Sequence, residues 1–308
     1  MLVEQLDRVK AIAPASRTLI LTNASLVRAI HRVAPRIPTK NIVAEPRPAG
    51  TAAALAWAAH VIQERDGPLA TMISVHADWS IANVAKFQST LVAAAEAAER
   101  HNGLVTVGIV PDRPETGLGY VQPGARASDG VWRVERFVEK PPRERAEALV
   151  ASGALWNSGI FVWRVGVFLN ELAAHSPEVG PALARNARSL RKFFAAVKTP
   201  IAVDHAVLER SANVYAMRGD FGWDDVGTWA SLHRVRARDA YDNAISGPGF
   251  VHDAANNVIH ADGQQVVLYG VENLVVVARD GLTLVTTRDR SVDLKKLVES
   301  LPPKVQKL

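Results

Sequence analysis

Short apolar runs alternate with helical patterns over the first 240 residues of the chain. Four continuous runs, rich in β-branched side chains and bounded by polar residues, are typical of strands covered on both faces. They span residues 18–22, 41–45, 69–78 and 104–110. Alanine-rich helical patterns lie between them, and the one that ends at Gly67, before Pro68, is expected to have Thr51 as its N-cap. This alternation predicts a Rossmann-like α/β fold with a mixed, mostly parallel sheet.

Beyond residue 110 the pattern is less regular. Strands are predicted at 132–140, 155–164 and 213–220, and a short helix is expected to open at Pro141–Pro142. The polar and alanine-rich stretch 165–198 is expected to form helices that cover the sheet.

After Tyr241 the helical period disappears until the last turns of the chain. Short apolar runs follow one another at fairly regular intervals, separated by glycine, asparagine and aspartate. This pattern predicts a small, solenoid-like β domain. The chain is therefore divided into an α/β domain over residues 1–240 and a β domain over residues 241–308.

Composition excludes several classes of protein. The 308 residues are 48% apolar and 22% charged, as in globular proteins. The net charge of +5 is small and scattered, which argues against a nucleic-acid binder. The absence of cysteine excludes disulfides, thiolate metal sites and cysteine nucleophiles. No apolar run reaches the roughly 18 residues of a membrane span, and the N-terminus lacks a signal-peptide core, so a soluble cytoplasmic protein is expected.

Two acidic positions fall at predicted strand ends, where ligands bind in open α/β sheets. Asp78 closes an apolar run, and Asp225 follows Asp224 at a strand-to-helix junction flanked by tryptophans. Either carboxylate suits a Mg²⁺ ion that is bound to a nucleotide phosphate. The alternatives are structural: Asp78 as a helix N-cap, and the acidic pair as a first helical turn that complements the helix dipole.

Three further segments carry groups that suit a phosphorylated sugar. Gly117 lies in a glycine-containing loop, where backbone N–H groups can approach a ligand. Glu139 and Lys140 stand at a strand end, where lysine suits a phosphate and glutamate a sugar hydroxyl. Asn157 can both donate to and accept from neighbouring hydroxyls. Taken singly, an ordinary loop, an exposed ion pair and a turn asparagine explain these residues equally well.

Taken in order, these motifs resemble the mannose-1-phosphate guanylyltransferases, or GDP-mannose pyrophosphorylases. The resemblance rests on EPRPAGTAAA, HADW, VTVGIVPDRPETGLGY, FVEKP, LWNSGIFVWR and FGWDDVGTW. It implies a reaction of GTP with mannose 1-phosphate that gives GDP-mannose and pyrophosphate with Mg²⁺. It also implies a Rossmann-like nucleotidyltransferase domain, a small C-terminal β-helical domain, and a homodimer, with neither nucleic acid nor membrane as a partner.

The resemblance assigns roles on the nucleotide side to three residues. Asp78 matches the aspartate of the family's P-A-D-H motif, and Asp225 matches that of D-V-G-T/S-W; together they are the implied Mg²⁺ ligands. Thr51 lies in the segment that matches the family's stretch beside the nucleotide. Asp78, Asp225 and Lys140 are the catalytic residues that the resemblance implies.

Four positions are assigned to the sugar side in the same way. Gly117 matches the glycine whose backbone meets the sugar. Glu139 and Lys140 match the E-K-P pair that holds the sugar and its phosphate. Asn157 matches the asparagine of W-N-S-G at the mannose pocket.

The chain departs from the family pattern in three places. Ala49–Gly50 replaces an Arg-Asn pair, and His76 and Trp79 stand where the family has proline and histidine around Asp78. The family's first strand and its G-G-x-G-x-R loop, which wraps the triphosphate, do not occur in the 308 residues, so slow turnover is expected of them. Two alternatives stay open: a non-catalytic, sugar-nucleotide-binding regulatory paralogue, and a nucleotidyltransferase for another sugar 1-phosphate.

Overall fold

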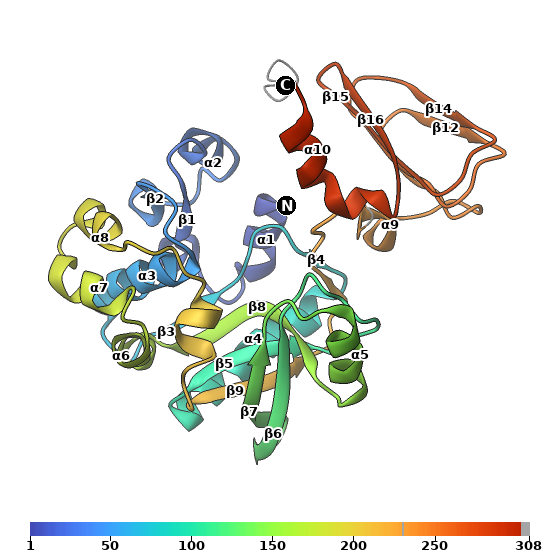
Figure 1. The fold of residues 1–308 in the computed structure, drawn as a ribbon. Coiled ribbons are helices and arrows are strands. Elements are labelled where there is room, and N and C mark those ends of the chain that lie inside the picture. The colour runs from blue at the N-terminus through green and yellow to red at the C-terminus, as the bar shows by residue number, and fades with distance from the viewer. Residues whose placement is uncertain (230, 303–308) are drawn as a thin grey trace. The chain divides into compact units, whose positions relative to one another are not determined.

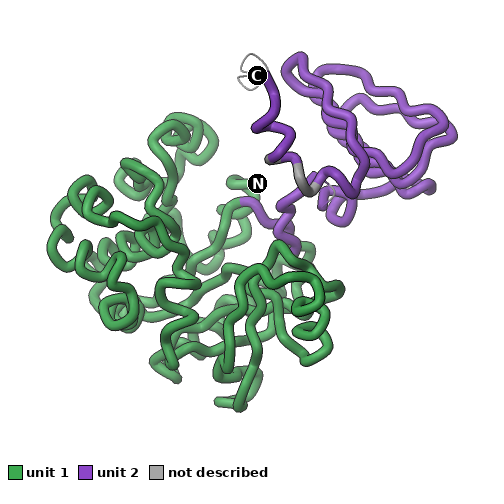
Figure 2. The backbone as a smooth tube through the Cα atoms, viewed as in Figure 1, with its two compact units in different colours: residues 1–77, 81–223 green, residues 78–80, 224–308 purple. Residues whose placement is uncertain are grey.

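The computed structural model describes residues 1–229 and 231–302, and the chain divides into two compact units (Figure 2). Unit 1 comprises residues 1–77 and 81–223, and unit 2 comprises residues 78–80 and 224–308. The sequence-based boundary at residue 240 falls inside unit 2, because helix α9 (Ser231–Val235) is tied to the turn that follows it. His233 Nε2 donates a hydrogen bond of 2.7 Å to the carbonyl oxygen of Asp242. Residues 303–308 of the predicted β domain lie outside the described residues.

Figure 1 traces the elements of unit 1. Its helices are α1 (Leu2–Val9), α2 (Val27–Val33), α3 (Thr51–Asp66), α4 (Val84–His101), α5 (Arg143–Ala151), α6 (Val165–His175), α7 (Gly180–Asn186) and α8 (Leu190–Ala196), with a π-helical turn η3 (Asp204–Leu208). Its strands are β1 (Ile20–Asn23), β2 (Ile42–Glu45), β3 (Thr71–Ser74), β5 (Leu104–Ile109), β6 (Tyr120–Ser128), β7 (Val131–Val138), β8 (Leu155–Arg164) and β9 (Val214–Gly219). The short strands β4 (Ser80–Ile81) and β10 (Trp223–Asp224) pair with each other where the chain passes between the units.

The main sheet has the strand order β3-β8-β5-β9-β7-β6, and the mixed α/β class is confirmed. β5 runs parallel to β9, and β1 runs parallel to β2, as the alternating pattern predicts. The other pairs of the main sheet are antiparallel. β8 runs against both β3 and β5 because the β6–β7 hairpin and α5 precede it, so that it enters the sheet beside the carboxyl end of β5. As a result β3, β5 and β9 share one direction, and their carboxyl ends lie at one edge.

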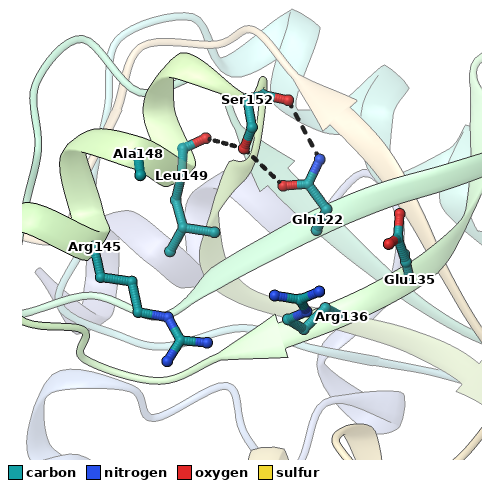
Figure 3. A pocket seen from close by; sticks show the side chains of 7 residues that line it. All are labelled: Gln122, Glu135, Arg136, Arg145, Ala148, Leu149 and Ser152. Atoms are coloured by element: carbon teal, nitrogen blue, oxygen red, sulfur yellow. Dashed lines mark hydrogen bonds between the residues drawn. The ribbon is translucent and has the colours of Figure 1, made fainter.

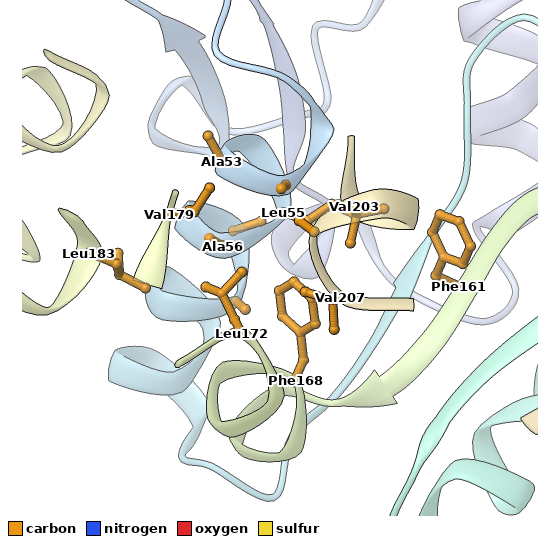
Figure 4. Close-up of a cluster of buried hydrophobic side chains, with 14 of the residues drawn as sticks. Ala53, Leu55, Ala56, Phe161, Phe168, Leu172, Val179, Leu183, Val203 and Val207 are labelled. Atoms are coloured by element: carbon orange, nitrogen blue, oxygen red, sulfur yellow. The ribbon is translucent and has the colours of Figure 1, made fainter. Parts of the chain in front are cut away.

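Both faces of this sheet are covered, which explains its continuous apolar runs. Every residue of β5 is buried. Successive residues of β8 face opposite sides of the sheet. Phe161 and Trp163 pack in the cluster formed with α3 and α6, whereas Ile160 and Val162, which alternate with them, are fully buried on the other side. Figure 4 shows Leu172 and other side chains of this cluster between the helices. Helix α4 packs across β3, β5, β8 and β9.

Helix α3 begins at Thr51, but the residue that caps it is Gly50. Gly50 has φ +84°, and a Cβ atom there would lie 2.2 Å from the carbonyl oxygen of Ile201. Only glycine meets both conditions, which gives a physical reason for the Ala49–Gly50 departure. The hydroxyl of Thr51, released from capping, accepts a hydrogen bond of 2.9 Å from the backbone N–H of Val203.

Unit 2 is a small β-helical domain, as predicted. Its strands are β11 (Ala244–Ser246), β12 (Gly249–His252), β13 (Val258–Ala261), β14 (Val266–Tyr269), β15 (Leu274–Arg279) and β16 (Leu282–Thr287), followed by helix α10 (Leu294–Ser300). β11, β13 and β15 stack in parallel, and β12 stacks in parallel on β14. Buried asparagines link successive turns: Asn257 Nδ2 donates to Asn243 Oδ1 at 3.0 Å, and Asn257 Oδ1 accepts from the N–H of Leu274 at 2.8 Å.

Candidate functional site

The loops that carry Asp78, Gly117 and Asp225 follow the carboxyl ends of β3, β5 and β9 respectively. β8 begins at the same edge, since Trp156 pairs with Ile109. This is the edge where open α/β sheets bind ligands.

In unit 1, three of the polar groups at this edge form a cluster, and two of them lie beside one glycine, Gly119. The backbone N–H of Asn157 donates to the carbonyl oxygen of Gly119 at 2.8 Å. A Cβ atom on Gly119 would lie 2.4 Å from Glu139 Oε2 and 3.5 Å from Cβ of Asn157. Any larger residue at this position would therefore displace the Glu139 carboxylate. The side chain of Asn157 is held by Thr106, whose hydroxyl donates to its Oδ1 at 3.2 Å.

The third group is Asp204, which the sequence analysis missed. Asn157 Nδ2 donates to Asp204 Oδ1 at 2.8 Å, so the asparagine bridges strand β8 and the turn η3. Burial raises the pKa of Asp204, and the nearby negative charge of Glu139 raises that pKa further. The only signal in the sequence is an acidic residue inside the apolar run IAVDHAVL, and no periodic pattern marks it. A buried carboxyl beside a second carboxylate is typical of a functional site.

Thr51 joins this cluster through the backbone. Its hydroxyl binds the N–H of Val203, the residue before Asp204. The first turn of α3 and the turn η3 are thereby fixed to each other, and the N–H of Ala52 also donates to the carbonyl oxygen of Ile201 at 3.2 Å. These bonds connect the start of α3, where the resemblance places the nucleotide, to the Asn157–Asp204 pair.

Lys140 lies at the rim of the cluster. Its Nζ is 3.1 Å from Glu139 Oε1, and its side chain is 64% exposed, whereas that of Glu139 is 21% exposed. The backbone of Lys140 has φ +44°, a strained conformation for a non-glycine residue outside a regular turn. Strain at such a position is common in ligand-binding loops, and here it directs the chain from β7 into Pro141 and α5.

Gly117 is in an exposed loop that is anchored at both ends. Tyr120 Oη donates to the carbonyl oxygen of Glu115 at 2.9 Å, and the Glu115 N–H donates back to Tyr120 Oη at 2.8 Å. The guanidinium of Arg113 lies 4.7 Å from the ring centroid of Trp156. The N–H of Gly117 itself donates to Glu115 Oε1 at 3.2 Å. Gly119, two residues further on, is the glycine that contacts Glu139 and Asn157.

Asp78 and Asp225 both belong to unit 2. The N–H of Ala82 donates to the carbonyl oxygen of Gly222, and the N–H of Asn83 donates to that of Phe221, both at 3.0 Å. From the first bond to the second, the donor moves one residue forward while the acceptor moves one residue back, so the two segments run antiparallel. Continuing this register through β4 and β10 brings Asp225 to the segment that holds Asp78.

The neighbouring acid, Asp224, is engaged elsewhere. Arg234 donates to both of its carboxylate oxygens, with Nε 2.7 Å from Oδ2 and Nη2 3.1 Å from Oδ1. Within residues 1–229 and 231–302, no group of three or more histidine, aspartate or glutamate side chains is placed to hold a metal ion. Asp78 is exposed and Asp225 is half-buried. Mg²⁺ prefers one or two carboxylates completed by phosphates and water, so the magnesium site stays a prediction that rests on these two residues.

Comparison with protein families decides the kinship of the chain. The family model described as "Nucleotidyl transferase" matches residues 13–241, and the "MannoseP isomerase/GMP-like beta-helix domain" model matches residues 251–301. The chain belongs to the nucleotidyl transferase family. Among described residues, no helix is long and apolar enough to cross a membrane.

Several curated members of this family resemble the chain. It is 40% identical over 277 residues to mannose-1-phosphate guanylyltransferases of Klebsiella pneumoniae and of Escherichia coli. Each match covers 85% of this chain and 58% of the relative, so the chain spans less than two thirds of their length. The alginate biosynthesis protein AlgA of Pseudomonas aeruginosa is 36% identical over 282 residues.

Solved structures support the same nucleotidyl transferase fold. A crystal structure described as mannose-1-phosphate geranyltransferase, from Thermus thermophilus, matches with a TM-score of 0.88 and 29% identity over 97% of this chain and 88% of that one. A structure of mannose-6-phosphate isomerase from Helicobacter pylori matches with a TM-score of 0.62 and 23% identity over 73% of this chain and 90% of that one, which supports the fold alone.

The raised pKa of Asp204 in the nucleotidyl transferase domain predicts a pH-dependent stability. A carboxyl whose pKa is raised on folding stabilises the protein most below its unfolded pKa, and this contribution is lost as pH rises through the folded pKa. Asp204→Asn removes the titration and keeps an oxygen that can accept from Asn157. The free energy of unfolding of the variant, relative to the wild type, should therefore rise between about pH 4 and pH 7, as measured by urea unfolding. A difference that is constant with pH would contradict the assignment.

Proposed function

We propose that the protein transfers a guanylyl group from GTP to mannose 1-phosphate, giving GDP-mannose and pyrophosphate. The observation that carries the proposal is a cluster in a chain of the nucleotidyl transferase family: Glu139 and Asn157 lie beside Gly119, and Asp204 is bound to Asn157. The names of the most similar curated relatives support this choice of sugar and nucleotide.

On the sugar side, the cluster supplies fixed hydrogen-bonding groups for hydroxyls. Asn157 is held by Thr106 and Asp204, so its orientation is set before a ligand arrives. Glu139 accepts from a sugar hydroxyl, and Gly119, which has no side chain, leaves room for the Glu139 carboxylate beside the backbone. Lys140, which pairs with Glu139, is exposed and long enough to turn its ammonium group toward the sugar phosphate.

The reaction needs no covalent enzyme intermediate. A phosphate oxygen of mannose 1-phosphate attacks the α-phosphorus of GTP; the bond from that phosphorus to the bridging oxygen of the β-phosphate breaks, and pyrophosphate leaves with the electron pair. The enzyme's contribution is positioning and charge neutralisation. Asp78 and Asp225 would hold a Mg²⁺ ion, which when bound would supply positive charge to the phosphate oxygens.

Pyrophosphate release from a panel of substrate pairs tests this function. We expect kcat/KM to be highest for GTP with mannose 1-phosphate, and to fall by roughly 10–100-fold when UTP or glucose 1-phosphate replaces either partner. Preference for another pair would assign a different sugar nucleotide. Absence of pyrophosphate release from every pair, with GDP-mannose still bound, would instead favour the non-catalytic, regulatory alternative.

A further inference from the structure

Unit 1 also has a pocket. It is formed by strands β6 and β7 and by helix α5, and its volume is about 350 Å³ (Figure 3). Its lining residues are Gln122, Glu135, Arg136, Arg145, Ala148, Leu149 and Ser152. None of them belongs to the group of residues that the proposed reaction uses.

Two arginines at this pocket lack partners within the described part of the chain. Neither the side chain of Arg136, on β7, nor that of Arg145, on α5, forms an ion pair or a hydrogen bond within the described residues, and Figure 3 shows both guanidinium groups at the pocket. Arg143, on the same helix, differs because its Nε lies 3.0 Å from Glu147 Oε1. Both side chains are exposed, so their two guanidinium groups are available to bind an anion at this one hollow.

The rest of the lining is ordered and partly apolar. Gln122 lies directly opposite Arg136 in the β6–β7 register. Ser152 fixes this glutamine from both sides: its hydroxyl donates to Gln122 Oε1 at 3.1 Å, and its carbonyl oxygen accepts from Gln122 Nε2 at 3.3 Å. Leu149 is 8% exposed and supplies apolar surface next to Ala148. The lining carries two positive charges and one negative charge, that of Glu135, so its net charge is positive.

We propose that this pocket is a second binding site, for a small phosphate monoester, with Arg136 and Arg145 holding the phosphate. Planar guanidinium groups bind phosphate oxygens in pairs, which gives geometry as well as charge. The apolar surface of Leu149 and Ala148 suits the carbon part of the ligand. The site is independent of the proposed reaction, so its test does not depend on turnover.

Titration of the whole chain with inorganic phosphate, at constant pH and ionic strength, tests the site. Amide proton–nitrogen correlation spectra report the chemical shift of each residue separately. Phosphate that binds at the sugar site therefore shifts the signals of other residues than those of this pocket. We expect saturable shifts at Arg136, Arg145 and Ser152, and a Kd raised at least about tenfold in the double variant Arg136→Gln, Arg145→Gln. The matched control, Arg143→Gln, removes the same charge from α5 and should change Kd less than about twofold.

A second variant keeps the test decisive if the double variant Arg136→Gln, Arg145→Gln fails to fold. Ala148 is exposed on α5, and Ala148→Glu keeps helix propensity while it places a negative charge at the pocket. It should raise the Kd for phosphate by a similar factor. Shifts that rise linearly without saturation, or a Kd equally affected by Arg143→Gln, would overturn the proposal, and so would equal or tighter binding of the dicarboxylate malonate.

Discussion

Asp225→Asn is expected to lower kcat by roughly 10²–10³-fold and to leave the melting temperature within about 2 °C of the wild type. The substitution keeps the shape of the side chain but removes one of the two charges that would hold Mg²⁺ against the substrate phosphates. Asp78→Asn, on the adjoining segment, should have an effect of the same order. Steady-state rates at saturating GTP and mannose 1-phosphate, with Mg²⁺ varied, measure both variants.

Asp224→Asn is the matched control for this prediction. Asp224 is the next residue in the chain, but Arg234 occupies both of its carboxylate oxygens. We therefore expect Asp224→Asn to lower the free energy of unfolding by about 1 kcal/mol and to reduce kcat less than about threefold. Near-normal turnover of Asp225→Asn at saturating Mg²⁺, or a larger rate loss in Asp224→Asn, would show that the metal-ligand assignment is wrong.

Lys140→Gln should lower kcat/KM for mannose 1-phosphate by about 10–100-fold, the usual loss for one charged hydrogen bond to a phosphate. Since the ammonium group acts on the sugar phosphate, KM for GTP should change much less. Initial rates with each substrate varied in turn separate the two effects.

Lys86→Gln provides the control for this loss. Lys86 is also exposed in unit 1 and also pairs with a carboxylate, its Nζ lying 2.9 Å from Asp220 Oδ2. It should keep a kcat/KM within about twofold of the wild type. An equal loss in both variants would mean that surface charge in general, rather than contact of Lys140 with the sugar phosphate, affects the rate.

The elements with strong patterns could be predicted closely from the sequence. Strand β8 spans the predicted residues, Leu155–Arg164, and β5 lies within its predicted run. The direction of β8 could not be predicted, because a strand buried on both faces has the same apolar run whether its neighbours are parallel or antiparallel. Strands β11 and β12 of the β-helical unit were missed, since neither Ala244–Ser246 nor Gly249–His252 forms a continuous apolar run.

The candidate site could be predicted only where a motif marks it. Glu139 and Asn157 lie beside Gly119, and the N–H of Gly117 donates to Glu115. The roles of these residues toward a ligand stay predictions. Asp204 was missed because its place comes from the π-helical turn and from its bond to Asn157, and both depend on long-range folding. The homodimer, the cytoplasmic location and Mg²⁺ as cofactor stay predictions.

The fate of labelled phosphorus tests the proposed reaction most directly. Mannose 1-phosphate labelled at phosphorus and GTP labelled at the γ-phosphate are incubated with the protein and Mg²⁺, and the products are separated. The account predicts that the sugar-phosphate label appears in GDP-mannose and the γ-label in pyrophosphate, in equal amounts. Release of either label as inorganic phosphate, or its transfer to any other product, would contradict in-line guanylyl transfer.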